Sequence, residues 1–89
     1  MLQAVYTKQF EKDLKRMIRR GKAVEHIKII IQLLVNEKLL EARYKNHKLA
    51  GYYKGRGECH IQPDWLLINK KTEQEIVFER TGTHSDLFE

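Results

Sequence analysis

The chain has 89 residues, a net charge of +5 at pH 7 and a single cysteine, Cys59. A lone cysteine cannot form an internal disulfide, which excludes a disulfide-stapled secreted scaffold and favours a reducing cytoplasm. No apolar run is long enough to cross a bilayer, and a basic chain of this size is expected to form one domain, residues 1–89, that binds an acidic partner.

The N-terminal half predicts a short strand followed by two helices. Residues 2–6 have strand propensity and end at Thr7, which can cap a helix. The first helix carries an apolar stripe with helical spacing, made of Phe10, Leu14, Met17 and Ile18. The second helix, residues 23–36, has a wider stripe and is expected to be the more deeply buried; its apolar residues are Val24, Ile27, Ile30, Ile31, Leu34 and Val35. Gly21 in the short connection predicts an antiparallel helical hairpin.

The rest of the chain predicts short strands at residues 52–54, 58–62, 65–70 and 75–81. Pro63 and Asp64 favour a tight turn in which Gln62 faces Trp65. Directly opposed residues share a face, so a regular hairpin predicts a helix-covered face of Cys59, Ile61, Leu66 and Ile68. The open face then carries Glu58, His60, Gln62, Trp65, Leu67 and Asn69. The last strand is apolar on both faces, which leaves its register open. The pattern predicts an α+β domain of two layers.

Cations and tyrosines are interleaved between residues 42 and 57, where no acidic residue occurs. The cations are Arg43, Lys45, Lys48, Lys54 and Arg56, and the rings are Tyr44, Tyr52 and Tyr53. Cations that hold phosphates beside rings that stack bases are typical of a track for single-stranded RNA. The alternative is a solvated basic loop.

The second half also holds the groups that metal-free RNA cleavage requires. Such cleavage needs a base for the 2′-hydroxyl, donors for the charge on the phosphate and an acid for the departing 5′-oxygen. Acid and base candidates are His47, His60, His84 and Asp64, and Arg80 can grip a phosphate with its planar fork. The assignment of the base stays open among His47, His60 and Asp64. A metal site is disfavoured because no histidine pair has the i, i+4 or H-x-H spacing, and no cofactor is expected.

Three motifs, taken as a set, resemble the YafQ branch of the RelE/ParE toxin superfamily. They are H-x-L-x-G from His47, H-I-x-P-D-W from His60 and E-R-T-G-T-H-x-x-L-F from Glu79. The resemblance is detailed over the second half of the chain and covers the first half only as a strand and two helices. It implies the two-layer RelE/ParE-like fold, with an N-terminal strand, a helical hairpin and an antiparallel β-meander packed on the helices.

The resemblance also implies a function. A toxin of this branch belongs to a type II toxin-antitoxin system and cleaves mRNA in the ribosomal decoding site, with no metal and no small-molecule cofactor. Its partners are a cognate antitoxin, the ribosome with its rRNA, and mRNA. The resemblance implies that His84 is the general acid and that Arg80 binds the scissile phosphate. It implies that the other proton-transfer and phosphate-contact residues are His47, His60 and Asp64. Trp65 and Phe88 would hold bases or maintain the shape of the site.

Two other functions fit a small basic domain. The ParE branch shares the fold and inhibits DNA gyrase by protein contacts, and a basic domain can also bind RNA without cleaving it. Neither function needs three histidines and an aspartate gathered in these motifs. The loop Lys54-Gly55-Arg56-Gly57 and Asn69 depart from the family pattern, so codon preference does not follow from the resemblance.

Overall fold

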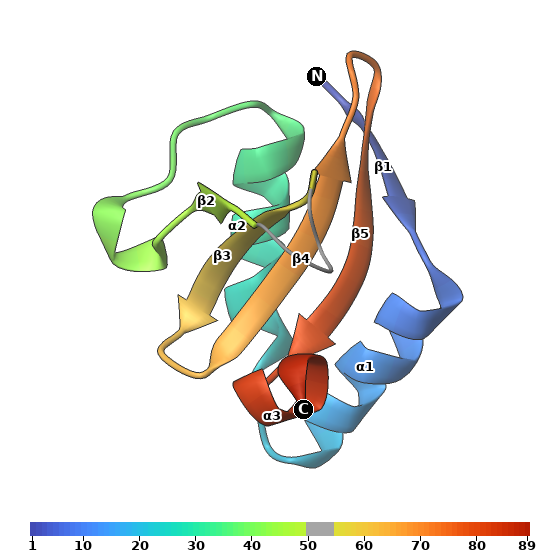
Figure 1. The fold of residues 1–89 in the computed structure, drawn as a ribbon, viewed down its shortest axis with the longest axis vertical. Coiled ribbons are helices and arrows are strands. Elements are labelled where there is room, and N and C mark those ends of the chain that lie inside the picture. The colour runs from blue at the N-terminus through green and yellow to red at the C-terminus, as the bar shows by residue number, and fades with distance from the viewer. Residues whose placement is uncertain (50–54) are drawn as a thin grey trace.

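The computed structural model of the protein describes residues 1–49 and 55–89. In chain order the elements are β1 (Gln3–Tyr6), α1 (Lys8–Arg19), α2 (Val24–Val35), a 3₁₀ turn η1 (Ala42–Tyr44), β2 (His47–Lys48), β3 (Gly57–Gln62), β4 (Trp65–Lys71), β5 (Glu75–Gly82) and α3 (His84–Phe88). Among the described residues, no helix combines the length and the apolar character needed to cross a membrane. The predicted α+β class is confirmed (Figure 1).

Over the described residues the sheet has five strands in the order β1-β5-β4-β3-β2. Strands β2 to β5 pair antiparallel with their neighbours in sequence, as a meander requires, while β1 lies parallel to β5. The strand predicted at residues 52–54 falls outside the described residues. The strand observed next to β3 is β2, which pairs His47 with Glu58. This pairing brings a motif histidine to the edge of the sheet.

The two helices form where the sequence predicts them. Thr7 caps α1, because its Oγ1 accepts a hydrogen bond from the Phe10 N–H at 2.9 Å. Gly21 has a φ of +94°, and the Lys22 N–H beyond it donates to the Met17 carbonyl, which is how a helix ends at a left-handed residue. In Figure 1, α1 descends beside the sheet and α2 returns upward behind it.

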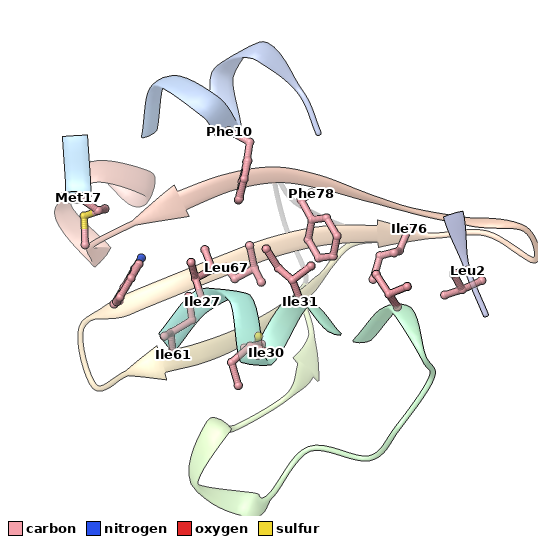
Figure 2. Packing of buried hydrophobic residues seen from close by; sticks show 13 residues of the cluster. Leu2, Phe10, Met17, Ile27, Ile30, Ile31, Ile61, Leu67, Ile76 and Phe78 are labelled. Carbon is pink, nitrogen blue, oxygen red and sulfur yellow. The ribbon is translucent and has the colours of Figure 1, made fainter. Parts of the chain in front are cut away.

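The main core lies between the helices and one face of the sheet. Figure 2 shows Phe10 of α1 directed toward β5, where its ring centroid lies 6.1 Å from that of Phe78. The predicted stripe of α2 supplies the buried residues Ile27, Ile30, Ile31 and Val35. The stripe predicted for α1 is wrong at Ile18, which is 45% exposed. The same helix also buries a polar residue, Asp13, completely.

A β-bulge changes the faces that a regular hairpin predicts. Gln62 does oppose Trp65, but His60 opposes Leu66, which leaves Ile61 as an extra residue on β3. The alternation along β4 is therefore offset by one residue. Trp65 and Leu67 join the helix-covered core, and Leu66 and Ile68 form a cluster with Leu87 on the opposite face. The predicted faces of these four β4 residues are wrong, whereas His60 lies on the open face as expected.

The same open face anchors the C-terminal segment. Leu87 of α3 packs on Leu66 and Ile68, and Leu49 is packed against them. A second irregularity, between Ile68 and Asn69, sets the register that the sequence left open: Arg80 opposes Ile68. Because opposed residues share a face, Arg80 starts from the side that carries His60.

Trp65 provides the first prediction, because its ring is fully buried and its Nε1–H donates to Thr81 Oγ1 at 2.9 Å. We expect Trp65→Ala to lower the free energy of unfolding by about 3–5 kcal/mol through loss of packing. Trp65→Phe keeps most of the volume, loses the hydrogen bond and is expected to cost about 1 kcal/mol. Urea denaturation measures both, and a Trp65→Ala variant as stable as the wild type would refute the core assignment.

Candidate active site

The candidate site lies on the open face of β3, β4 and β5, beneath α3. Strand pairing places His60, Leu66 and Gly82 in one row, and Glu58, Ile68 and Arg80 in the next. Residues two strands apart lie about 10 Å from each other across a sheet. The apolar central strand therefore forms a floor with Glu58 and His60 on one side and the end of β5 on the other.

One carboxylate oxygen joins two of the predicted histidines. Oε1 of Glu58 lies 3.0 Å from His47 Nε2 and 3.3 Å from His60 Nε2. The Glu58 side chain is only 6% exposed, that of His60 is 14% exposed and that of His47 is 50% exposed. The Glu58 carboxylate is therefore placed to stabilise a positive charge that forms on either ring during a reaction. Glu58 was not predicted as a site residue, although its place two residues before His60 in one strand puts both on the same face.

A second carboxylate fixes the third histidine. Oδ1 of Asp64, in the β3–β4 turn, accepts the His84 backbone N–H at 2.9 Å and lies 2.6 Å from His84 Nδ1. The backbone hydrogen bond and then the side-chain one hold the pKa of Asp64 below its usual value. Nδ1 is the nitrogen that contacts Asp64, so Nε2 is the one left for a substrate, and the side chain is 54% exposed.

The three histidines form a continuous row. The ring centroids of His47 and His60 are 6.4 Å apart, and those of His60 and His84 are 5.7 Å apart. Phe88 continues the row, with its ring centroid 6.3 Å from that of His84, and it is 45% exposed. The structure thus brings together His47, His60, His84 and Asp64, as the sequence predicts.

Local capping shapes the segment that carries His84. Thr83 Oγ1 accepts the Asp86 N–H at 3.1 Å, and Asp86 Oδ2 accepts the Thr83 N–H at 2.9 Å, which is a capping box. Gly82 is required here, since a Cβ at that position would lie 2.9 Å from the Asp86 Cβ. The helix α3 was not predicted, although the T-x-x-D spacing of Thr83 and Asp86 signals it.

An ion pair holds α3 against α1. Arg20 Nη1 and Nη2 donate to the two carboxylate oxygens of Asp86 at 2.6 and 3.1 Å. These bonds, followed by those within the capping box, depress the pKa of Asp86 well below its usual range. Arg16 adds a further contact to Asp86 at 3.8 Å. The position of His84 is therefore set from both sides, by Asp64 and by the anchored helix.

Arg80 is held by a buried carboxylate that the sequence did not single out. Asp13 is fully buried and accepts from Arg80 Nε at 2.7 Å, from Arg80 Nη2 at 3.3 Å and from the Thr81 backbone N–H at 3.2 Å. The one sequence signal for a structural role of Asp13 is that a charged residue lies among the apolar stripe residues of α1. The contact fixes the guanidinium plane of Arg80, and its side chain keeps 26% of its surface exposed.

The predicted RNA-contacting residues fall into four groups. Lys45, Lys48 and Phe88 are exposed. Arg56 is half-buried, and its Nε donates to Glu79 Oε1 at 2.7 Å, which neutralises part of the predicted track. Lys54 lies outside the described residues. Trp65 is buried, so the prediction that it presents its ring on the open face is wrong, because the bulge at Ile61 turns it into the core.

Two other groups bear on the chemistry. Cys59 is fully buried, and burial followed by the nearby Glu58 charge raises the pKa of its thiol to about 12, which removes it as a nucleophile near neutral pH. His47, Glu58 and His60 bring one ligand atom each within 4.8 Å of one another, so these three side chains have the spacing of a metal-ligand set. The expectation that no such set is pre-formed relied on spacing within one segment, whereas pairing of β2 with β3 assembles this one.

Comparison with known proteins agrees on one family. Residues 2–89 match the profile of a family described as bacterial toxin of type II toxin-antitoxin system, YafQ. A curated protein from Escherichia coli K12, named mRNA interferase toxin YafQ, is 45% identical over 84 residues, which are 93% of this chain and 91% of that protein.

Solved structures give the same result. The crystal structure of the E. coli DinJ–YafQ toxin-antitoxin complex matches with a TM-score of 0.92 at 42% identity, over 99% of this chain and 98% of that one. A structure titled metal-bound toxin from Helicobacter pylori matches with a TM-score of 0.91 at 37% identity, over 99% and 100% of the two chains.

Asp86 provides the second prediction. Its pKa in the folded state lies below the unfolded value of about 3.9, so its carboxylate stabilises the fold above about pH 4 and this contribution is lost as the pH falls further. Asp86→Asn keeps the shape of the side chain and removes the charge that Arg20 contacts. We expect a loss of about 1 kcal/mol at pH 7 that shrinks below pH 4. Urea unfolding at pH 3, 5 and 7 tests this, and a difference independent of pH would argue against an ionic role.

Proposed function

The chain belongs to the YafQ family of bacterial toxins of type II toxin-antitoxin systems, and on that premise we propose that it is an endoribonuclease that cleaves mRNA in the ribosomal decoding site. The name mRNA interferase, carried by the E. coli relative, supports the reaction class. The observation that carries the proposal is the row of three histidines in which Asp64 fixes His84 and Glu58 lies against His47 and His60. This arrangement suits transesterification by acid and base without a metal.

His84 is the general acid in this proposal. Asp64 Oδ1 lies 2.6 Å from Nδ1 and is placed to stabilise the imidazolium form, which carries its second proton on Nε2. A positioned acid protonates the departing 5′-oxygen as the P–O bond breaks. The second contact, from the His84 backbone N–H to Asp64, prevents the carboxylate from turning away.

His60 is the general base. Its ring lies beside that of His84, with the centroids 5.7 Å apart, and it is backed by Glu58. When His60 takes the proton of the 2′-hydroxyl it becomes positively charged, and the Glu58 carboxylate 3.3 Å away stabilises that charge. His47 shares the same carboxylate and lies on the exposed side of it, where its ring can contact the phosphate. The Asp64 carboxylate already contacts His84 through two hydrogen bonds, which supports a role for Asp64 in positioning His84.

Arg80 binds the scissile phosphate. Asp13 holds its Nε and Nη2 and so orients the guanidinium plane before substrate arrives. A pre-oriented cation stabilises charge that develops on the phosphate without reorganisation. Lys45 and Lys48 lie exposed ahead of β3 and next to His47, where they can track the RNA backbone, and exposed Phe88 offers a ring to a neighbouring base.

The proposed partners follow from the family and the charge. The E. coli YafQ structure contains the antitoxin DinJ, which supports an antitoxin partner for this chain as well. With a net charge of +5, the toxin suits an acidic antitoxin arm laid over the face that carries His60, Arg80 and His84, or in place of the Leu87–Phe88 tail. The same charge suits rRNA, the ribosomal partner that decoding-site cleavage requires.

The test of function is an in vitro translation reaction with purified protein. Shortened mRNA in the presence of ribosomes supports the proposal, and intact mRNA with relaxed or poisoned DNA would support gyrase inhibition instead. Cleavage of free mRNA at the same rate would contradict the ribosome-dependent part.

The third prediction concerns His84. We expect His84→Ala to lower the single-turnover cleavage rate by roughly 10²–10⁴-fold, the usual contribution of a proton-transfer group, with the fold retained. His26→Ala is the matched control, because His26 is exposed on α2, and it should cleave at the wild-type rate. Undiminished cleavage by His84→Ala would remove this residue from the mechanism.

The fourth prediction separates the phosphate clamp from the RNA track. Arg80→Lys keeps the charge and loses the planar fork that Asp13 orients, so it should lower the cleavage rate. Lys45→Ala and Lys48→Ala should instead weaken ribosome or RNA binding and reduce its salt dependence by about one unit of slope for each lost phosphate contact. The measurements are RNA binding across a salt series and single-turnover cleavage rates for each variant. If the three substitutions weakened binding equally and none changed the cleavage rate, the separate roles of Arg80 and the two lysines would be contradicted.

A further inference from the structure

A cavity lies at one end of the main core, between the connection from α2 to β2 and the adjoining ends of β3 and β4. Its volume is about 1040 Å³, comparable with the largest small-molecule pockets. We propose that this cavity takes one nucleobase turned out from a single-stranded RNA, with Asn69 pairing with the edge of the base and lysines at the rim holding a phosphate. RNA is taken as the ligand on the basis of the proposed function, whereas the binding can be measured without cleavage.

The cavity lies on the side of the sheet that the helices cover. Asn69 pairs with Gly57 on β3 and with Phe78 on β5, and Phe78 belongs to the main core, so Asn69 faces the same side. Leu34 of α2 and Ile76 of β5 supply apolar walls. Figure 1 shows the connection between α2 and β2 looping outward from the sheet before the chain returns at β2. The core therefore ends in a cavity at this point.

The Asn69 side chain is the feature that points to a ligand. It is only 6% exposed, it borders the cavity, and its amide makes no hydrogen bond with any other described residue. A buried amide without partners is costly. A Cβ on Gly57 would lie 3.4 Å from Asn69 Oδ1, so the glycine leaves room beside the amide. An amide offers a donor and an acceptor side by side, which is the pattern that pairs with the edge of a nucleobase.

The rim of the cavity suits a phosphate. Among the described residues that border it are four cations and two acids, which are Lys38, Lys48, Arg56, Lys71, Glu37 and Glu73. Lys71 Nζ lies 3.3 Å from Glu37 Oε1, and Arg56 Nε donates to Glu79. Lys38 and Lys48 are exposed, where a phosphate attached to the bound base can reach them. The excess of positive charge favours an anionic ligand over a neutral one.

The edge strand β2 connects the cavity with the active site. His47 and Lys48 both border the cavity, and the His47 ring also contacts Glu58 in the active site. An RNA strand held on the open face therefore has to pass only this two-residue strand to reach the cavity. Unstacked bases of single-stranded RNA are commonly turned out into protein pockets. Leu39 also borders the cavity and is 97% exposed, so it offers the base an apolar contact.

The binding test titrates isotope-labelled full-length protein with AMP, GMP, CMP and UMP and follows side-chain amide and backbone signals by NMR. The chain has only three asparagines, so the Asn69 amide can be assigned by substitution. We expect saturable shifts at Asn69, Lys71 and Thr72. The unphosphorylated nucleosides should bind more weakly, by a margin that shrinks as salt rises. Shifts confined to Arg80 and His84, or no saturation by any nucleotide or by a short single-stranded RNA, would overturn the site.

Asn69→Leu separates a ligand-binding role from a structural one. Leucine has a similar branched shape, so removing an amide without partners should leave the free energy of unfolding unchanged or raise it. Affinity for the nucleotides should fall about tenfold or more, because hydrogen bonds to the base are lost. Asn36→Leu is the matched control: it removes an exposed amide at the end of α2 and should bind like the wild type.

Wild-type affinity in Asn69→Leu would overturn the pairing with a base. If that variant fails to fold, Leu39→Ser decides at a position whose exposure leaves the fold unaffected. Weakened nucleotide binding by Leu39→Ser would support the cavity, and unchanged binding would overturn it.

A short single-stranded RNA identifies the source of the base. If it shifts the Asn69 amide and binds more tightly than the monophosphates, the base belongs to an RNA chain, as proposed. If only the monophosphates shift this amide, the ligand is a free nucleotide and the RNA subsite is overturned. An acidic peptide that shifts the Asn69 amide where nucleotides and RNA do not would assign the cavity to a protein partner and would also overturn it.

The activity measurement is kept separate from binding. In the translation reaction, Asn69→Leu should raise the mRNA concentration needed for half-maximal cleavage and leave the single-turnover rate at saturation unchanged, because Asn69 lies on the face opposite His60. A lower rate at saturation would contradict this separation of binding from chemistry. A protein that binds nucleotides through Asn69 but never cleaves mRNA would contradict the proposed function and leave the nucleobase cavity standing.

Discussion

The buried carboxylate of Asp13 is the interaction on which the rest of the site depends. β1 ends at Tyr6, and beyond that point α1 runs alongside β5 in its place. Asp13 occupies this junction and accepts the Thr81 N–H, a backbone donor that has no β1 residue opposite it. A buried backbone donor without a partner is costly, so this bond makes the junction possible. The carboxylate also accepts hydrogen bonds from Arg80, Gln9 and Arg16.

From Asp13 a chain of ion pairs leads to the catalytic segment. Arg16 contacts both Asp13 and Asp86, and Arg20 forms a two-pronged pair with Asp86 at the start of α3. The Arg16 and Arg20 side chains are 33% and 44% exposed, and ion pairs with such arginines add only modest stability. The first helix therefore fixes two separate parts of the site, the guanidinium of Arg80 and the helix that carries His84. Leu87 completes the attachment by packing on the apolar floor of β4.

The site contains two carboxylate–histidine groups. Each of two carboxylates faces histidine, Asp64 with His84 and Glu58 with both His47 and His60. The exposed Asp64 pair suits a ring that must hold and then release a proton to substrate. The buried Glu58 group places two rings on one carboxylate oxygen.

The sequence by itself determined the α+β class, the two helices, the tight turn at Pro63–Asp64 and the identity of the three motif histidines, Asp64 and Arg80. These features follow from local causes: helical periodicity, capping by Thr7, the fixed φ of proline and motifs contained in short segments. Only the tertiary structure decided the faces of β4, because one extra residue at Ile61 reverses the faces of residues 65–68 without altering the apolar pattern. The roles of Asp13 and Glu58 were decided in the same way. Their partners, Arg80 and His47, lie 67 and 11 residues away in sequence and meet them only when α1 packs beside β5 and β2 pairs with β3.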